Sequence, residues 1–326
     1  METEGAAEAK QQGRFWNHSP IDILFVGYVV AFLIGMGVWL WYFDRLGLGW
    51  NIAIGVVAGL GHFYNYIVVN HEFMHTPPFR SKWLNLAMNT LSSVTLVYWM
   101  SLIDDGHKLH HAFNNDPKRG GKTKDPTSTW LKGRNGQQEP LLSYILLNFI
   151  RVNLPGPFMS VVRSVWTKKN PWPRRQFICE SIALALTLGV VIAINPWFLI
   201  PMVLFSYVGW VLTDMQNYYE HYRAGSPGTK YANSVSYYGK FYNIMMFNEG
   251  YHQEHHLRPT AHWTERPQLR EKYRKEMEDA GHYVSKVPLS LGFLDRSPPP
   301  PPSPDESESD ALDLGKQPVE SESPDQ

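Results

Sequence analysis

Residues 21–70 read IDILFVGYVVAFLIGMGVWLWYFDRLGLGWNIAIGVVAGLGHFYNYIVVN. Two long apolar runs, at about 21–43 and 50–70, are separated there only by the short turn DRLGLG. A helix of about 20 apolar residues crosses the hydrocarbon core of a bilayer, so each run is long enough to span it. The pattern returns at about 177–194 and 197–214, around an Asn-Pro turn. The sequence therefore predicts an all-α integral membrane protein with four transmembrane helices in two hairpins.

The charge distribution predicts how these helices are oriented. Lys and Arg number 30, as do Asp and Glu, but only Arg45 lies in the two predicted hairpin turns. By the positive-inside rule, both termini and the polar bulk of the chain face the cytoplasm. We expect a polar N-terminal segment (1–20), one membrane domain (21–290) and a solvated, disordered tail (297–326) rich in Pro, Ser and acidic residues. The single cysteine, Cys179, excludes an intrachain disulfide and a thiolate metal site.

Nine of the thirteen histidines fall in four short clusters, each just beyond an apolar run on the predicted cytoplasmic side. Their spacings are i, i+3 or i, i+4, which place side chains on one face of a helix. Asn217 stands four residues before one of them, His221, and shares its face. The clusters are HEFMH (His71, His75), HKLHH (His107, His110, His111), NYYEH (His221) and HQEHH (His252, His255, His256).

This number of clustered imidazoles indicates a metal centre. Neutral imidazole is a common ligand of iron, zinc, copper and nickel. Nine exceed what one metal binds, whereas two metals with about four or five each account for all of them. Zinc sites close at four ligands, and iron sites keep positions open for oxygen chemistry, so the pattern favours two iron ions with O₂ as co-substrate. The other four histidines lack partners at this spacing: His62 is expected to face away from the centre, and His18, His262 and His282 to lie at the surface.

Two further apolar runs, 83–103 and 141–162, complicate the count of spans. If the first crossed the bilayer, His75 and His107 would face opposite compartments and could not share a metal centre. We therefore interpret residues 83–103 as an interfacial or re-entrant segment. An arginine and a Pro-Gly-Pro sequence interrupt the second run, which favours a helix lying along the membrane surface.

Two other kinds of protein fit part of this pattern. HEFMH also matches the zinc-protease motif HExxH, with Glu72 as general base. A protease would use the two histidines of that motif and leave the other clustered ones without a role. A metal transporter would place its ligands within the spans, along a pathway. Because the histidines stand at the ends of the spans, the pattern favours an enzyme.

The clusters resemble the three histidine boxes, HxxxH, HxxHH and HxxHH, of the membrane fatty acid desaturase and hydroxylase superfamily. The similarity covers about residues 20–270. It implies a non-haem di-iron centre held in a cytoplasmic helical cap above a four-helix membrane stem. Desaturases of this type also carry an Asn, which reaches iron through water, and a His between the second and third boxes. The metal ligands that the resemblance implies are His71, His75, His107, His110, His111, Asn217, His221, His252, His255 and His256.

The boxes leave the reaction open between related enzymes. HEFMH and NYYEHY look like motifs of alkane hydroxylases, whereas HKLHH has the desaturase spacing. Fatty acid decarboxylases that form terminal alkenes have similar boxes. The resemblance implies an O₂-dependent fatty acyl desaturase, with hydroxylation or decarboxylation as the alternative. The chain has no HPGG motif of a fused cytochrome b5, which implies a separate electron donor of ferredoxin, cytochrome b5 or rubredoxin type. A lipid or fatty acyl substrate and membrane lipids are the other expected partners, and no nucleic acid is.

Several other side chains are candidates for supporting roles. A lipid tunnel is expected between the spans, although aromatic residues there also suit core packing. Acidic residues inside or beside the boxes are candidates to orient imidazoles. The aromatic candidates are Tyr64, Tyr66, Trp99 and Trp210, and the acidic ones are Glu220, Glu254, Asp104, Asp105 and Asp116.

Overall fold

The computed structural model describes residues 15–117, 122–225 and 229–297, and these residues are mostly helical. Within them the only extended pairing is two isolated bridges, Trp16 with Phe79 and Ser236 with Val284. The α-helices are α2 (Ile23–Tyr42), α3 (Leu48–Tyr64), α4 (His71–His75), α5 (Lys82–Leu96), α6 (Met100–Phe113), α7 (Leu141–Val152), α8 (Pro155–Thr167), α9 (Trp172–Ile194), α10 (Leu199–His221), α11 (Lys240–Met245), α12 (His252–Leu257) and α13 (Arg266–Asp279).

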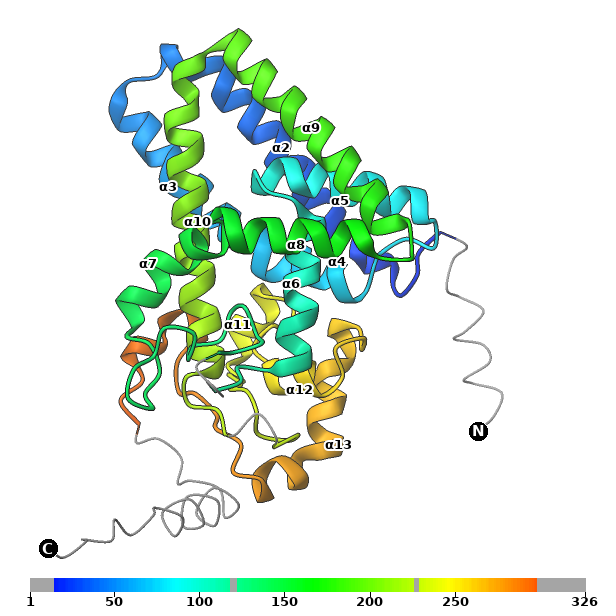
Figure 1. Cartoon of the computed structure of the whole chain (residues 1–326), viewed down its shortest axis with the longest axis vertical. Coiled ribbons are helices and arrows are strands. Elements are labelled where there is room, and N and C mark those ends of the chain that lie inside the picture. The colour runs from blue at the N-terminus through cyan, green and yellow to red at the C-terminus, as the bar shows by residue number, and fades with distance from the viewer. Residues whose placement is uncertain (1–14, 118–121, 226–228, 298–326) are drawn as a thin grey trace, which may run out of the picture.

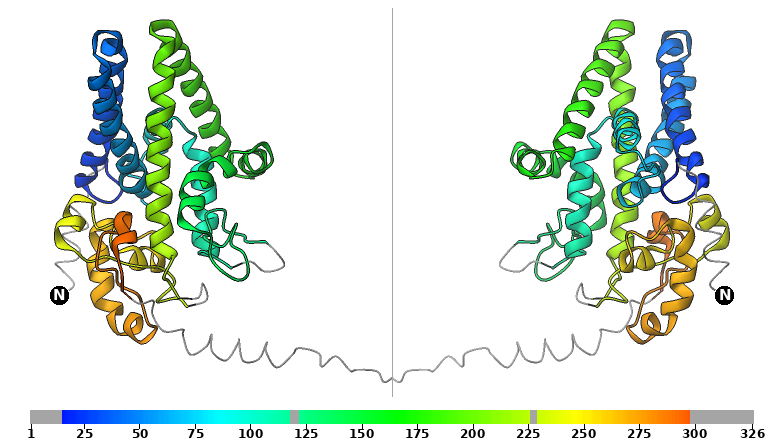
Figure 2. Two further views of the ribbon diagram at one scale, coloured as in Figure 1. Left: turned by 90° about the vertical axis from the view of Figure 1, so that its left-hand side faces the viewer. Right: turned by 90° about the vertical axis from the view of Figure 1, so that its right-hand side faces the viewer.

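Four helical stretches are long and apolar enough to cross a membrane. The loops between α2 and α3 and between α9 and α10 lie at one end of the molecule, and the short helices α11 to α13 lie at the other (Figures 1 and 2). Apolar side chains such as Ile34, Val57 and Leu186 are more than half exposed on these helices, as lipid-facing residues are. The stretches are Pro20–Arg45, Leu48–His75, Trp172–Ile194 and Pro196–His221. The prediction of an all-α, multi-pass membrane protein is confirmed, and the side of the membrane on which each end lies stays a prediction.

The apolar run 83–103 does not form one straight helix. The α5 and α6 axes meet at 94°, and Val97 at the break has a left-handed φ of 52°. The first turn of α6 is held by α9, because the buried carboxylate of Glu180 accepts hydrogen bonds from the Ser101 backbone N–H (3.1 Å) and hydroxyl (2.6 Å). A carboxylate at a helix N-terminus satisfies free N–H groups there. The run is therefore bent, as are α7 and α8, by 57°, and its interfacial or re-entrant placement stays a prediction.

A π-helical segment, η3 (Asn65–Asn70), joins α3 to α4 and carries the second long helix onward to the first histidine box. Its polar ends are fully buried, and the Asn65 amide donates to the Thr95 hydroxyl of α5 at 2.8 Å. The Asn70 amide donates back to the Asn65 carbonyl oxygen, also at 2.8 Å. π segments inside α-helices occur frequently at functional sites. Here the segment fixes the register with which His71 and His75 enter the centre of the protein.

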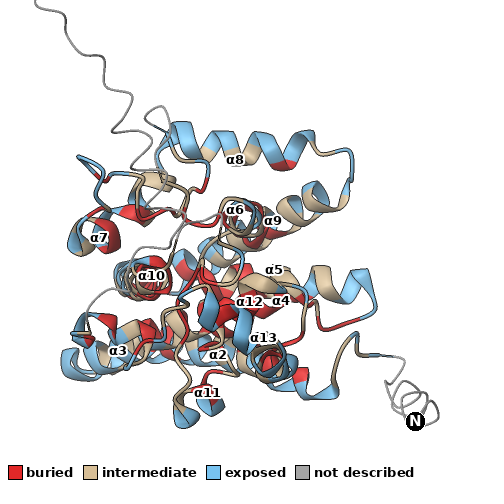
Figure 3. Cartoon of the chain, turned by 90° about the horizontal axis from the view of Figure 1, so that it is seen from below, coloured by how far each residue is buried: buried red, intermediate tan, exposed pale blue. Residues whose placement is uncertain are grey.

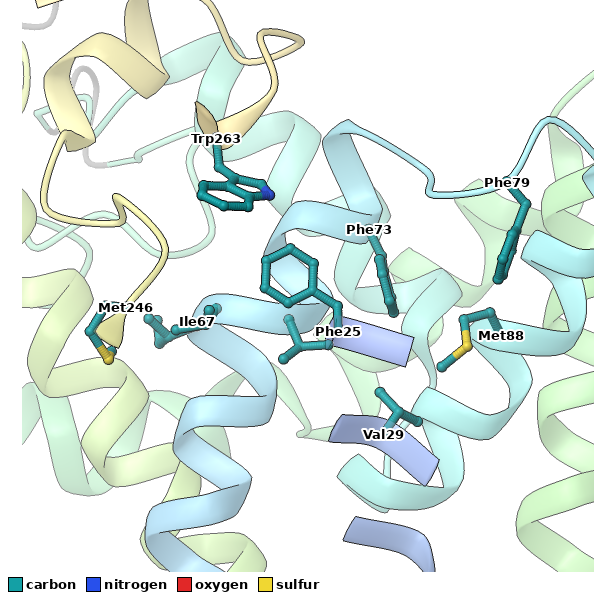
Figure 4. Close-up of a cluster of buried hydrophobic side chains, with 10 residues drawn as sticks. Phe25, Val29, Ile67, Phe73, Phe79, Met88, Met246 and Trp263 are labelled. Atoms are coloured by element: carbon teal, nitrogen blue, oxygen red, sulfur yellow. The ribbon is translucent and has the colours of Figure 1, made fainter. Parts of the chain in front are cut away.

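The main apolar core ties the N-terminal helices to the C-terminal part of the chain. Phe25 and Val29 of α2, Ile67 of η3, Phe73 of α4 and Met88 of α5 pack together, with Phe79, Met246 and Trp263 beside them (Figure 4). Each fully buried side chain of this size contributes about 1.5–3 kcal/mol relative to its exposed state. Seen from below, the buried residues gather where α4, α10 and α12 meet (Figure 3). The core therefore joins α4, which carries the first histidine box, to the segments that precede and follow α12.

Three of the four histidines outside the clusters were expected at the surface, and all three are more buried than that. His262, predicted at the surface, is 3% exposed and pairs with Asp22 at 2.9 Å, so that prediction is wrong. The pair joins two parts of the chain 240 residues apart, which no local pattern indicates. His18 and His282 are half-buried, and His62 is fully buried between α3 and α10. The predicted tail, apart from Ser297, and residues 1–14 lie outside the described ranges.

Candidate metal centre

Five histidines from three helices each bring one ring nitrogen to a common point. These nitrogens lie within 4.8 Å of one another. The Nε2 atom of His107 lies 2.7 Å from that of His75 and 3.0 Å from that of His111. The Nε2 atom of His255 lies 3.0 Å from that of His71 and 3.1 Å from that of His111. We call these residues the first histidine group: His71 and His75 of α4, His107 and His111 of α6, and His255 of α12.

The remaining four clustered histidines form a second group beside the first. They are His110 of α6, His221 of α10, and His252 and His256 of α12, and their nitrogens also lie within 4.8 Å of one another. The Nε2 atoms of His221 and His252 are 3.4 Å apart. The two groups adjoin, because the ring centroids of His111 and His256 are 4.4 Å apart.

Helix geometry explains why two of the boxes contribute to both groups. Residues four apart on an α-helix differ by about 40° in direction, whereas the intervening i+3 residue points about 100° away from the i+4 one. The i, i+4 pair of α6, His107 and His111, therefore enters the first group while His110 turns to the second. On α12 the arrangement is reversed, since its i, i+4 pair belongs to the second group and His255 to the first. The spacing in the sequence predicted that nine histidines gather, but it did not predict this division.

The two groups fit metal ions by their spacing and chemistry. Two imidazole nitrogens bound at about 2.1 Å to one metal, at right angles, lie about 3 Å apart. The observed separations of 2.7–3.4 Å match this value. Burial, together with neighbouring positive charge, keeps the pKa values of His252, His255 and His256 well below the usual range, so these rings are neutral. Neutral imidazoles present lone pairs to one another here, and these histidines would serve as ligands of a cation bound between them.

Buried carboxylates orient the outer nitrogens of two of these rings. His71 donates through Nδ1 to Glu249 at 2.9 Å, and His110 donates through Nδ1 to Asp125 at 2.8 Å. Burial by itself would raise the pKa of either carboxyl, but the adjacent imidazole, together with Arg266 beside Glu249 and backbone N–H donors at Asp125, outweighs it and the pKa is lowered. Such carboxylate–imidazole pairs fix the ring orientation of metal-binding histidines. Sequence analysis missed both acids, although Glu249 stands only three residues before His252.

A fully buried arginine connects these supporting groups. The Arg266 guanidinium pairs with Glu249 at 3.0 Å and with Glu72 inside the first box. One of its terminal nitrogens also lies 3.2 Å from the Nδ1 atom of His255. A buried carboxylate needs such a partner, because an unpaired charge in the interior is strongly destabilising. Glu72, the general base of the protease alternative, is therefore held in a buried ion pair.

The other predicted site residues lie beside the groups or away from them. Asn217 lines the same cavity as His110 and His252. Its amide donates to the Tyr144 hydroxyl at 2.7 Å, and its role as a ligand stays a prediction. Glu220 Oε2 lies 3.6 Å from His252 Nε2. The other acidic candidates bind elsewhere: Glu254 accepts from Ser236 and Tyr238, Asp104 pairs with Lys108, Asp105 pairs with Lys168, and Asp116 accepts from the backbone N–H of Lys124 and Asp125.

A cavity bounded by α6, α7, α8 and α10 reaches both histidine groups. It encloses about 1150 Å³ of space between protein atoms, part of it open to solvent, and His71, His107, His110 and His252 line one end. Of the four aromatic candidates, Tyr66 and Trp210 line it. The other two do not: the Tyr64 hydroxyl donates to the Met245 carbonyl oxygen, and the Trp99 ring nitrogen donates to the Ser181 hydroxyl.

Comparison with known proteins gives an independent test of the resemblance. A family model described as fatty acid desaturase matches residues 48–288, which include all four histidine clusters. None of the curated proteins compared with the chain is similar to it. The match covers well over half of the sequence and contains α3 to α13, the helices that build the histidine groups and the cavity. The chain therefore belongs to the fatty acid desaturase family, and with it to the oxidoreductases that act on fatty acyl chains.

Proposed function

We propose that this protein is an O₂-dependent fatty acyl desaturase whose histidine groups hold two iron ions. The observation that carries the proposal is the pair of adjoining all-imidazole groups, of five and four histidines, at the end of an apolar cavity. Iron suits imidazole ligands, and the family is one that uses iron. Bound iron and O₂ would supply the oxidising power to break unactivated C–H bonds, which no acid or base side chain can supply. Asn217 is proposed as a further ligand of the second group, acting through water.

The protein's own residues would bind and position the substrate and the ligands. Glu249 and Asp125 hold the rings of His71 and His110 in place. The cavity wall, which includes Phe149 and Trp210, would hold an alkyl chain against the exposed edges of the metal-binding rings. Exclusion of water by this wall protects a reactive site from side reactions. The carbon that is attacked would be set by how far the chain enters.

Desaturation and hydroxylation share the removal of a first hydrogen atom and differ in the second step. Loss of a second hydrogen gives a double bond, and transfer of a hydroxyl gives an alcohol. The HKLHH spacing of α6 supports desaturation. NYYEHY, at the end of α10, supports hydroxylation as the second candidate.

We further propose that the histidine end of the molecule faces the cytoplasm. All basic residues except Arg45 lie outside the turns α2–α3 and α9–α10. A separate electron donor of ferredoxin, cytochrome b5 or rubredoxin type would reach the iron from that side.

The test is expression of the full chain in bacteria fed saturated fatty acids, with analysis of lipids and headspace by gas chromatography–mass spectrometry. His255→Ala removes a ligand of the first group, and His18→Ala is the matched control outside both groups. We expect a new unsaturated chain from the wild type and the control and none from His255→Ala. A hydroxylated chain or a 1-alkene with the same dependence would overturn the desaturase assignment. Iron content of the purified proteins is measured in parallel, and full iron in His255→Ala would contradict the proposed ligand set.

A further inference from the structure

The cavity beside the metal centre has a polar patch in an otherwise largely apolar wall. Leu102, Ile103 and Phe149 are typical of that wall and suit an alkyl chain. Three buried polar residues, Asn148 of α7 and Thr213 and Asp214 of α10, line the same cavity. We call these three residues the polar patch. A plain hydrocarbon chain cannot form a hydrogen bond with any of them.

The polar patch is only partly paired within the protein. The Asn148 amide donates to Asp214 Oδ1 at 2.8 Å. Three other oxygens, Asn148 Oδ1, Thr213 Oγ1 and Asp214 Oδ2, are buried in the wall without a hydrogen-bond partner among the described residues. Leaving a buried polar atom unpaired costs about 1–3 kcal/mol, so three in one place call for a partner.

A phenol on the adjoining part of the wall adds a hydrogen-bond donor. Tyr66, on the π-helical segment η3, lines the cavity, and its ring centroid lies 5.0 Å from that of Trp210, one turn before Asp214 on α10. Its hydroxyl makes no hydrogen bond to the described residues. The cavity thus offers a donor, Tyr66, and acceptors, the polar patch, to the same occupant.

The polar patch lies at a defined distance along α10 from the second histidine group. Asp214 precedes His221 by seven residues on α10, which is about two turns or 10 Å along the axis and nearly the same direction around it. An alkyl chain that reaches the histidines from this side therefore passes the patch. A group that both donates to a carboxylate and accepts from a phenol is needed there, and a hydroxyl does both.

We propose that the substrate is an acyl chain bearing a hydroxyl group, which the polar patch and Tyr66 recognise at a fixed distance from the carbon that reacts. The inference rests on the proposed function, since it assigns the substrate class of the same cavity. It predicts that hydroxyl position along the chain, and not only chain length, determines binding.

The test is competition binding with the purified full-length protein in detergent. Unlabelled octadecanoic acid and its monohydroxy isomers, with the hydroxyl at successive carbons, compete against radiolabelled octadecanoic acid. We expect one isomer, or a few neighbouring ones, to compete at a concentration at least about tenfold lower than the parent acid needs. This difference corresponds to one charge-assisted hydrogen bond. Asp214→Leu and Tyr66→Phe should each remove this preference while binding of the parent acid persists. Tyr98→Phe is the matched control, because the Tyr98 hydroxyl in the same cavity is already paired with Asn153 at 2.7 Å.

Equal competition by all isomers would overturn the inference, and so would a preference that survives both Asp214→Leu and Tyr66→Phe. The Tyr66→Phe change removes a single oxygen atom, so it tests the idea even if the Asp214 variant fails to fold. Iron content and desaturation of unsubstituted chains are assayed on the same samples. If those two persist without any hydroxyl preference, the inference fails while the proposed function stands. If iron is absent from the wild type, the proposed function itself fails.

Discussion

Replacement of Asp125 by Asn should weaken one metal position and spare the other. The buried Asp125 carboxylate accepts four hydrogen bonds. Its Oδ2 accepts from His110 Nδ1 and the Asn115 backbone N–H, both at 2.8 Å. Its Oδ1 accepts from the Thr127 backbone N–H at 2.7 Å and the Thr127 hydroxyl at 2.8 Å. Each of these four neighbours of the carboxylate is therefore a donor.

An amide in this place has only one acceptor oxygen. Whichever way the amide is turned, its NH₂ group faces a backbone N–H, of either Asn115 or Thr127, so at least one hydrogen bond is lost together with the negative charge beside His110. Loss of a carboxylate that orients a metal-binding histidine costs about 10–100-fold in metal affinity, or about 1.4–2.7 kcal/mol. His110 belongs to the second histidine group. We therefore expect the iron of that group to be released about 10–100 times more readily, with the first group unchanged.

The measurement is a chelator titration of the iron-loaded protein, with iron content followed by mass spectrometry. The wild type should release two ions over one range of chelator, and Asp125→Asn should release one of them much earlier. Asp104→Asn is the matched control, since Asp104 is a carboxylate on α6 that pairs with Lys108 and contacts no histidine of either group. Identical titrations for wild type and Asp125→Asn would refute the assigned role, and early loss of both ions would refute the division into two groups.

Three further changes test how the site is supported. Arg266→Met leaves the buried Glu72 without its ion-pair partner and leaves Glu249 with His71 alone. It should cost about 3–5 kcal/mol of folding stability, seen as a large fall in melting temperature that Arg266→Lys partly avoids. Gly209→Ala places a Cβ 2.2 Å from the Nδ1 atom of His62, so the close approach of α3 and α10 should be lost at about 1–3 kcal/mol, and an unchanged melting temperature would contradict this packing. Glu180→Leu removes the acceptor of the Ser101 N–H and hydroxyl at the first turn of α6. Limited proteolysis should then show faster cleavage at the α5–α6 break, and an unaltered rate would show that the Glu180 carboxylate is not needed there.

The gathering of the nine clustered histidines could be predicted from sequence because local spacing carries most of the information. The i, i+3 and i, i+4 separations of HKLHH and HQEHH put their rings on one side of a helix whatever the rest of the chain does. The four long apolar runs likewise predict helices, although α10 continues seven residues past the predicted end at 214. That extension places Asn217 and His221 on the helix itself. Hydropathy could not predict it because the last two turns of α10 are polar.

The supporting groups could not be predicted because their partners are remote in sequence. Glu249 bonds to His71 across 178 residues, and Arg266 pairs with Glu72 across 194. No spacing rule connects such residues, and an acidic residue is too common to single out. The two acids chosen for their place inside a box, Glu220 and Glu254, differ in outcome. Glu220 Oε2 lies 3.6 Å from His252 Nε2, whereas Glu254 accepts hydrogen bonds from the hydroxyls of Ser236 and Tyr238.

The difference between local spacing and contacts remote in sequence also explains why the histidine boxes leave the reaction undecided. In the proposed centre the boxes would fix which atoms surround the metals, and the resemblance implies that related enzymes with different products share that set of atoms. A desaturase and a hydroxylase differ in where the chain lies when the first hydrogen atom has gone. That position depends on the cavity wall, which α6, α7, α8 and α10 build from residues such as Leu102, Phe149 and Asp214 that belong to no box. Mutations that redirect the product should therefore lie along this wall, and mutations in the boxes should abolish all products together.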